Sequence, residues 1–223
     1  MKFQTAFEIE YPETDGRPMG ETDLHRDWMH WIIDLLKFRY RGQQVYVSGN
    51  LLLYYEEGDP SHFVVPDAMV VKDCPPYRRR IFKVWEEQRV PNVVVETTSR
   101  STKHEDTSFK TQLYEQLGVR EYFLYDPTAD YLRPPLQGWR LGKDRFERIT
   151  ADAAGRLGSE ELGLQLQLED GDLVMYDARS GDRLLTEAEA NQAAYEAERA
   201  ARERAEAEIR RLQQKLHDRG ISD

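Results

Sequence analysis

The chain has 223 residues, of which 39% are hydrophobic and 32% are charged. This composition excludes a disordered chain, and the apolar runs are far shorter than the roughly 18 residues of a membrane span. The net charge of −10 argues against a protein that coats nucleic acid through bulk electrostatics, although it leaves room for an enzyme with a local basic cleft.

The start of the sequence lacks the unbroken apolar stretch of a secretion signal. A single cysteine, Cys74, excludes an internal disulfide and a cysteine-based zinc site. Together these features predict a cytoplasmic protein that makes no membrane contact.

The first predicted element is an amphipathic helix after the turn-rich segment 12–20. Apolar residues recur at spacings of three and four from Leu24 to Leu36, a Thr22 or Asp23 cap precedes them, and the helix is expected to end near Gly42. Strand-like runs follow at 44–47, 50–55 and 63–71, with a turn at 57–60. This order is typical of an antiparallel meander.

A strand, a helix and a second strand are predicted next, at 92–97, 104–117 and 121–126, and Gly118 closes the helix. This order indicates a right-handed parallel crossover. Further strands are expected at 145–149, 162–168 and 173–176, and Asp170 with Gly171 marks a hairpin turn. The sequence therefore predicts an α/β (α+β) fold, with a mixed central sheet flanked by helices and a C-terminal β-hairpin.

The C-terminal segment differs in composition from the rest of the chain. Residues 186–218 contain no Gly or Pro, and Thr186 stands three residues before Glu189, as in a capping box. We expect one long charged helix, so that residues 1–183 form one domain and residues 184–223 an appendage. Its last part, with Ile209, Leu212 and Leu216, fits a coiled-coil seam that would pair two protomers, and the alternative is a solvated helix.

Two acidic residues occupy places where burial makes charge costly. Asp67 interrupts the apolar run 63–71, and Glu96 ends the run 93–95. Two converging carboxylates fit a hard divalent cation whose coordination is completed by water. The alternative is that Asp67 is a turn or edge residue and that Glu96 caps the following loop.

The predicted helix after Glu96 carries polar residues on one face. Asp106, Lys110 and Tyr114 are spaced by four residues, and from this face the lysine can reach the carboxyl end of the preceding strand. The alternative is that Asp106 and Lys110 form an ordinary surface ion pair.

Four segments together closely resemble the Uma-type putative restriction endonuclease family, which belongs to the PD-(D/E)XK nuclease superfamily. They are VPDAMV at 65–70, VVETTSRST at 94–102, DTSFKTQLYEQLGVREYFLYDP at 106–127, and the helix-entry segment DGRPMGETDLH at 15–25. No single segment is specific to the family, but the ordered set is, and it extends over roughly residues 20 to 130.

The resemblance implies a restriction-endonuclease-like core that hydrolyses DNA phosphodiester bonds with Mg²⁺ or Mn²⁺. Asp67 matches the aspartate of the superfamily's PD pair, and Glu96 matches its second acidic residue, so both would bind the metal. Thr98 stands where the superfamily carries a lysine, and Lys110 is the position from which this family supplies the cation. The implied catalytic residues are therefore Asp67, Glu96 and Lys110.

Other candidates are accessory. The resemblance brings the region of Glu21 and His25 near the cleft, Ser99 can donate a hydrogen bond to phosphate or to Glu96, and Asp106 lies beside Lys110. For Glu21, His25 and Ser99 the competing role is helix capping or anchoring of a loop. The candidates for contacts with DNA phosphates are basic residues, for which a solvated loop is the alternative: Arg78, Arg79, Arg80 and Lys103.

Two rival functions remain open at this point. One is a nuclease-fold scaffold without activity that acts through its C-terminal helix, which the acidic charge and the missing strand lysine favour. The other is a phosphoesterase that acts on small nucleotides, which the lack of a strongly basic surface favours.

Overall fold

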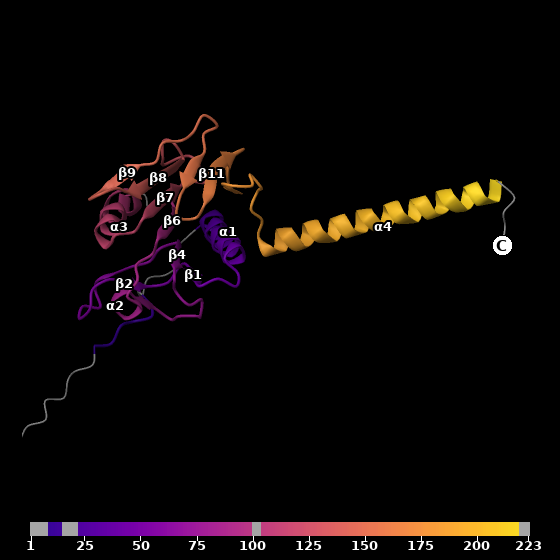
Figure 1. The fold of residues 1–223 in the computed structure, drawn as a ribbon. Coiled ribbons are helices and arrows are strands. Elements are labelled where there is room, and N and C mark those ends of the chain that lie inside the picture. Colours follow the sequence, from indigo (N-terminus) through magenta and orange to yellow (C-terminus); the bar gives the residue numbers. More distant parts are fainter. Residues whose placement is uncertain (1–8, 15–21, 100–103, 219–223) are drawn as a thin grey trace, which may run out of the picture. The chain divides into compact units, whose positions relative to one another are not determined.

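The computed structural model describes residues 9–14, 22–99 and 104–218 (Figure 1). Its main sheet has the strand order β1-β4-β6-β7-β8-β9. Within this sheet, as far as the described residues go, β6 and β7 are the one parallel pair, and the helical segment between them confirms the predicted parallel crossover. The strands are β1 (Val45–Ser48), β4 (Ala68–Lys72), β6 (Val93–Thr97), β7 (Glu121–Tyr125), β8 (Leu136–Leu141) and β9 (Phe146–Arg148).

Two three-stranded sheets accompany the main sheet. In the first, β2 (Leu53–Tyr54) lies between β3 (Phe63–Val64) and β5 (Phe82–Lys83). The second consists of β10 (Leu157–Ser159), β11 (Leu164–Glu169) and β12 (Asp172–Asp177). The antiparallel pair β11 and β12 is the predicted C-terminal hairpin, to which β10 adds a strand that the sequence reading did not include.

The predicted antiparallel meander is wrong, because the strands of this region belong to two different sheets. The run 63–71 breaks at Pro66 and Asp67, so β3 pairs with β2, whereas β4 pairs with β1. The backbone N–H of Asn50 donates to the Pro66 carbonyl at 2.8 Å. A Cβ atom on Gly49 would lie only 1.8 Å from the carbonyl oxygen of Asp67, so this close approach of two backbones requires glycine.

The first helix, α1 (Asp23–Arg39), begins at the predicted Thr22 cap, whose side chain accepts a hydrogen bond from the His25 N–H at 3.2 Å. Leu24 does not belong to its buried face, since 43% of this residue is exposed. Met29 and Ile33 are buried instead, so the buried stripe is rotated relative to the predicted one.

The predicted helix 104–117 is helical but not uniform. It opens as a π-helical segment, η1 (Glu105–Lys110), and continues as α3 (Thr111–Leu117), which ends at Gly118 in the left-handed conformation. A further short helix, α2 (Val84–Glu87), follows β5 directly.

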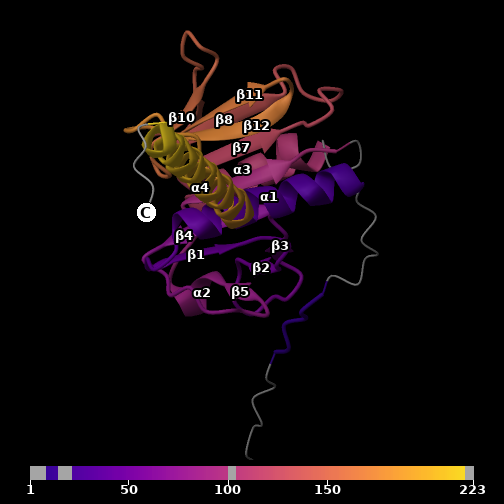
Figure 2. The same ribbon diagram turned by 90° about the vertical axis from the view of Figure 1, so that its right-hand side faces the viewer.

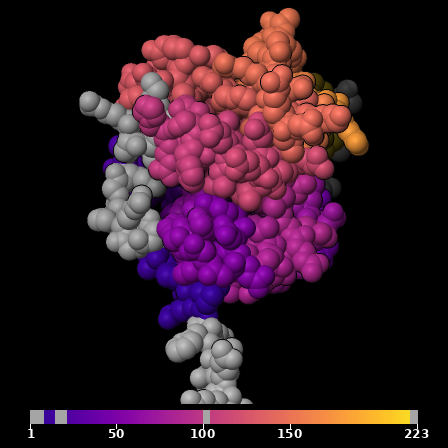
Figure 3. All heavy atoms as spheres, turned by 90° about the vertical axis from the view of Figure 1, so that its left-hand side faces the viewer, coloured from indigo at the N-terminus to yellow at the C-terminus, as the bar shows by residue number. Residues whose placement is uncertain are grey.

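Each face of the main sheet packs against its own hydrophobic core. On one face, α1 and the β10-β11-β12 sheet bury residues such as Ile32, Val70 and Leu164. On the other, α3 and the β3-β2-β5 sheet bury Leu53 and Leu113. Figure 2 shows α1 crossing in front of β4 and β1, and Figure 3 shows the face where violet residues of the small sheet adjoin magenta residues of the α3 segment.

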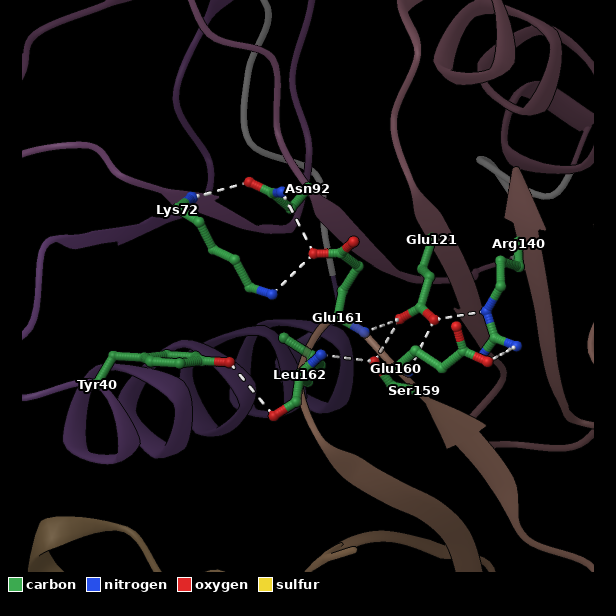
Figure 4. Close-up of polar contacts among 9 residues, drawn as sticks. All are labelled: Tyr40, Lys72, Asn92, Glu121, Arg140, Ser159, Glu160, Glu161 and Leu162. Atoms are coloured by element: carbon green, nitrogen blue, oxygen red, sulfur yellow. Dashed lines mark hydrogen bonds and ion pairs between the residues drawn. The ribbon is translucent and has the colours of Figure 1, made fainter. Parts of the chain in front are cut away.

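A buried carboxylate fastens the turn after β10 to the main sheet (Figure 4). Glu121 is 0% exposed and accepts hydrogen bonds from the Arg140 side chain at 2.9 Å and from the Glu160 N–H at 2.8 Å. The Ser159 hydroxyl and the Glu161 N–H also donate to it. This set of donors balances the cost of burying the charge.

The same turn is held from β4 and α1 as well (Figure 4). The Lys72 ammonium lies 2.8 Å from the Glu161 carboxylate, to which Asn92 also donates. The Tyr40 hydroxyl donates to the Leu162 carbonyl at 3.4 Å. Residues 159–162 therefore connect the β10-β11-β12 sheet to β7, β8 and β4 and to Tyr40 at the C-terminal end of α1.

The chain divides into two compact units, residues 1–184 and 185–223. The second unit contains α4 (Glu187–Asp218), which confirms the predicted long C-terminal helix. Its capping box is present, because the Thr186 N–H donates to the Glu189 carboxylate at 2.7 Å and the Glu189 N–H donates to the Thr186 hydroxyl at 3.2 Å. Among the helices of the described ranges, none combines the length and apolar character needed to cross a bilayer.

Candidate active site

The two acidic residues singled out by the sequence come together at one end of the main sheet. Asp67 immediately precedes β4 and Glu96 lies in β6, where the pairing of Ala68 with Val95 makes them neighbours. The Asp67 N–H donates to Glu96 Oε2 at 3.2 Å, and the Thr97 N–H donates to Asp67 Oδ2 at 2.7 Å. Glu96 is 0% exposed, so its carboxylate is a buried group rather than a loop cap.

Lys110 reaches the same carboxylate from η1. Its Nζ lies 3.0 Å from Glu96 Oε2 and 3.1 Å from Asp106 Oδ1, and it donates to the Val65 carbonyl at 3.4 Å. The side chains of Lys110 and Asp106 are 8% and 1% exposed. The pair is therefore buried in the cluster and is not the surface ion pair of the alternative interpretation.

The π-helical segment is held in place around Asp106. Its backbone carbonyl accepts hydrogen bonds from the Tyr122 hydroxyl at 3.0 Å and from the Thr111 hydroxyl at 2.8 Å. The Thr98 hydroxyl lies 3.4 Å from its carboxylate. Thr98, which stands at the superfamily's lysine position, thus contacts η1, the segment that carries Lys110.

Two further residues belong to the cluster: His25, whose region the resemblance placed near the cleft with capping as the competing role, and Tyr114, which its spacing placed on the Lys110 face of the helix without a role in the site. His25 Nε2, from the first turn of α1, lies 3.1 Å from Asp67 Oδ2. The Tyr114 hydroxyl, from α3, donates to Glu96 Oε1 at 2.8 Å. The four-residue spacing of Tyr114 from Lys110 was the signal for its place, whereas His25 resembled a residue of a helix cap.

Burial and charge act in opposite directions on the ionisable groups. Burial raises the pKa of Glu96 well above its usual range, although the Lys110 charge opposes the shift. For Asp67 burial also acts to raise the pKa, but the His25 hydrogen bond and the Lys110 charge outweigh it, and the pKa is lowered. The charges of Glu96 and Asp106 raise the pKa of Lys110 despite its burial, so the lysine stays protonated.

The other predicted residues have different positions. Ser99 is half-buried just after β6, while Glu21 and Lys103 fall outside the described residues. Arg78 is exposed, and Arg80 lies 2.6 Å from the Glu13 carboxylate with 81% of its side chain exposed.

Arg79, for which a phosphate contact was predicted, is engaged in contacts within the protein. Its side chain is 3% exposed, and its guanidinium donates to the two oxygens of Glu87 at 2.6 and 2.8 Å. It also packs 4.2 Å from the Tyr46 ring centre and 3.8 Å from that of Tyr77. These contacts make Arg79 part of the framework, because an arginine in a loop with a carboxylate partner and two aromatic neighbours is fixed inside the protein.

The donors at the site suit a hard cation only in part. Asp67 and Glu96 offer carboxylate oxygens, which Mg²⁺ and Mn²⁺ prefer. Over residues 9–14, 22–99 and 104–218, however, no group of three or more His, Cys, Asp and Glu side chains is arranged to hold a metal ion. A cation bound here would take two protein carboxylates and complete its coordination with water or substrate, as Mg²⁺ commonly does.

A mixed sheet with two carboxylates and a buried lysine at one end is an arrangement that suits metal-assisted hydrolysis. The chain matches the sequence model of the family Uma2, described as "Putative restriction endonuclease", over residues 3–172. It belongs to this family, which indicates a nuclease, and a nuclease acts on nucleic acid.

The other comparisons are distant. No curated protein matches the chain in sequence. Among solved structures, a "putative nuclease belonging to DUF820" from Anabaena variabilis is similar, with 15% identity and a TM-score of 0.48 over 69% of this chain and 86% of that one.

Proposed function

We propose that the protein is a metal-dependent endonuclease that hydrolyses DNA phosphodiester bonds at the cluster of Asp67, Glu96 and Lys110. The observation that carries the proposal is their convergence on one oxygen: Glu96 Oε2 lies 3.0 Å from Lys110 Nζ and 3.2 Å from the Asp67 N–H. Three groups distant in sequence, all buried, meet where β4, β6 and η1 end or begin.

Asp67 and Glu96 are the residues that would hold Mg²⁺ or Mn²⁺. When bound, such a cation polarises a phosphoryl oxygen and lowers the pKa of a coordinated water. A hydrogen bond from the Thr97 N–H and the ion pair with His25 fix Asp67, and the Tyr114 hydroxyl fixes Glu96. Ligands held in this way need little reorganisation when they bind their ion.

Lys110 supplies a fixed positive charge rather than a base. Because Glu96 and Asp106 keep it protonated, it can donate hydrogen bonds to a phosphoryl oxygen or to the attacking water, but it cannot accept a proton from that water near neutral pH. Asp106 holds the ammonium in position. Lys110 comes from a helix rather than from β6, and it replaces the lysine that the superfamily carries at the position of Thr98.

The test is a cleavage assay on supercoiled, linear and single-stranded DNA with Mg²⁺, with Mn²⁺ and with a chelator. Asp67→Asn and Glu96→Gln should each lower metal-dependent cleavage by about 100-fold or more. The matched control is Asp144→Asn, which alters an exposed carboxylate and should leave cleavage unchanged. Circular dichroism verifies that each variant is folded, and undiminished cleavage by either site variant would refute the assignment.

Calorimetry with Mg²⁺ separates this proposal from its rivals. Binding that both site variants abolish supports a metal-dependent hydrolase, whereas no binding to the folded protein supports the inactive scaffold. Cleavage of nucleotides but not of DNA would support the small-nucleotide phosphoesterase.

We also propose that α4 pairs two copies of the chain through its last third. Ile209, Leu212 and Leu216 are 54%, 49% and 48% exposed, and their spacing of three and four residues is that of a coiled-coil seam. Charged pairs at spacing four, such as Arg199 with Glu203, support the rest of the helix as a solvated element. In a measurement of solution mass, the full chain should be a dimer and a chain ending at residue 184 should be a monomer. The same number of chains per particle in both proteins would contradict the pairing.

A further inference from the structure

A groove separate from the carboxylate cluster runs beside β1 and has a volume of about 430 Å³. Its walls are the C-terminal end of α1, the strand itself and the loop 76–79. Among the residues that line it are Lys37, Arg41, Arg78 and Arg79, and no carboxylate is among them. In a chain with a net charge of −10, a groove lined by basic side chains and by no acidic one favours an anionic ligand.

The cations of the groove are not equivalent. Arg79 is neutralised by Glu87 and is held between two tyrosines, so it forms a rigid wall. Lys37 and Arg78 are exposed at the rim. Tyr77, which is 56% exposed, adds an aromatic side chain next to them.

The floor of the groove is the outer edge of the main sheet. Within the described part of the chain, β1 is the terminal strand and pairs only with β4. The Gln44 carbonyl accepts from the Cys74 N–H on the β4 side, so by the alternation of antiparallel strands the N–H groups of Val45 and Val47 point outward. Figure 2 shows β1 between α1 and the β3-β2-β5 sheet.

The groove leads toward the carboxylate cluster. Ser48, at the end of β1, lines it, and the next residue, Gly49, packs against the backbone carbonyl of Asp67. A linear ligand that lies along β1 would therefore arrive beside Asp67.

We propose that this groove binds the sugar-phosphate backbone of a nucleic-acid single strand and directs it to the Asp67 end of the sheet. Binding proteins for single strands combine a basic groove with aromatic side chains, and this groove offers both. The direction of the strand rests on the proposed nuclease function, whereas the binding does not.

An extended acidic peptide is a weaker fit to the same features. Only Val45 and Val47 of the four residues in β1 face outward, so a peptide strand would form few ladder hydrogen bonds. A phosphate chain can use these N–H groups together with Lys37 and Arg78, and each phosphate neutralised by a cation adds to affinity.

The experiment measures binding of a labelled DNA single strand of about 12 nucleotides to the full chain by fluorescence anisotropy, with a chelator present so that nothing is cleaved. The double variant Lys37→Gln/Arg78→Gln should bind about 10-fold more weakly near 0.1 M salt, and the slope of log K against log salt should fall by about 1.4. The control variant Lys143→Gln/Arg145→Gln removes two exposed cations from the β8-β9 loop and should match the wild type.

Unchanged affinity and salt slope in the groove variant would overturn the proposal. So would competition by a poly-glutamate peptide that equals competition by a single strand of the same charge, or a preference for duplex over single strand. Cleavage by Asp67→Asn is measured separately. Groove-dependent binding without metal-dependent cleavage would refute the proposed nuclease activity and support the binding groove. Metal-dependent cleavage without groove-dependent binding would support the nuclease activity and refute the binding groove.

Discussion

Replacing Lys110 with methionine removes the charge at the centre of the cluster and keeps most of the side-chain volume. The ammonium lies 3.0 Å from Glu96 and 3.1 Å from Asp106, which are 0% and 1% exposed. At an effective dielectric constant of about 20, each of these charge pairs is worth about 5 kcal/mol. Burial of the ions offsets much of this attraction, and removing one partner from a buried cluster typically costs about 3–5 kcal/mol.

The loss should depend on pH in a direction that the structure fixes. The pKa of Glu96 is already raised by burial, and without the opposing charge of Lys110 it rises further. At a pH between the ordinary pKa of a glutamate and the raised pKa of Glu96, the folded variant binds more protons than the unfolded chain. The stability of the variant therefore falls as the pH rises through this interval. The free energy of unfolding should therefore fall short of the wild type by more at about pH 8 than at about pH 5.

Urea unfolding followed by circular dichroism measures the loss. The double variant Glu96→Gln/Lys110→Met should recover at least about 1 kcal/mol relative to Lys110→Met alone, because it no longer buries the Glu96 charge without a cation. Lys143→Met, on an exposed loop, should change stability by less than about 0.5 kcal/mol. A loss below about 1 kcal/mol for Lys110→Met, or a larger loss when Glu96→Gln is added, would refute the reasoning.

Three further predictions concern single contacts. Tyr114→Phe removes the hydrogen bond to Glu96 and should cost about 1–2 kcal/mol in urea unfolding, with weaker binding of Mg²⁺ in calorimetry. Glu121→Ala leaves the donors around this buried carboxylate unsatisfied and should cost about 3–5 kcal/mol, and a cost below about 1 kcal/mol would contradict this role. The hydrogen bond from Arg79 lowers the pKa of Glu87, so Glu87→Gln should destabilise the protein at neutral pH by about 1–3 kcal/mol. This loss of stability should shrink as the pH falls below about 4, because Glu87 of the wild type is then protonated. An equal loss at neutral and at acidic pH would exclude the ion pair as its cause.

The carboxylates of the site could be found from the sequence because local patterns expose them. A carboxylate within an apolar run needs a compensating partner when it is buried, which singled out Asp67 and Glu96, and the family resemblance then paired them as metal ligands. The position of Lys110 followed from its spacing on a predicted helix. The placement of Lys110 beside Glu96 needs only the crossover from β6 to β7, whereas Asp67 is brought to Glu96 by the antiparallel pairing of β4 with β6.

The contacts that were missed depend on pairing between distant segments. Nothing local indicates that 45–48 pairs with 68–72 rather than with 53–54, because register follows from the packing of both faces. Strand β8 contains Gly138 and polar residues, so its pattern resembles a loop, and only its pairing with β7 makes it a strand. His25 could not be distinguished from a capping residue until α1 was placed beside Asp67.

The π-helical start of the helix that follows β6 is where local propensity and the site diverge. A regular α-helix is expected from the sequence at 104–117, but the structure widens its first turns over the segment that carries Asp106 and Lys110. Such segments are rare and occur frequently at functional sites, since they cost stability that packing elsewhere must supply. Here Tyr122 and Thr111 hold the Asp106 carbonyl, so the altered helix is fixed by the strand and helix that follow it. The lysine absent from position 98 is thus provided by a helix whose irregular geometry directs an ammonium group to the end of the neighbouring strand.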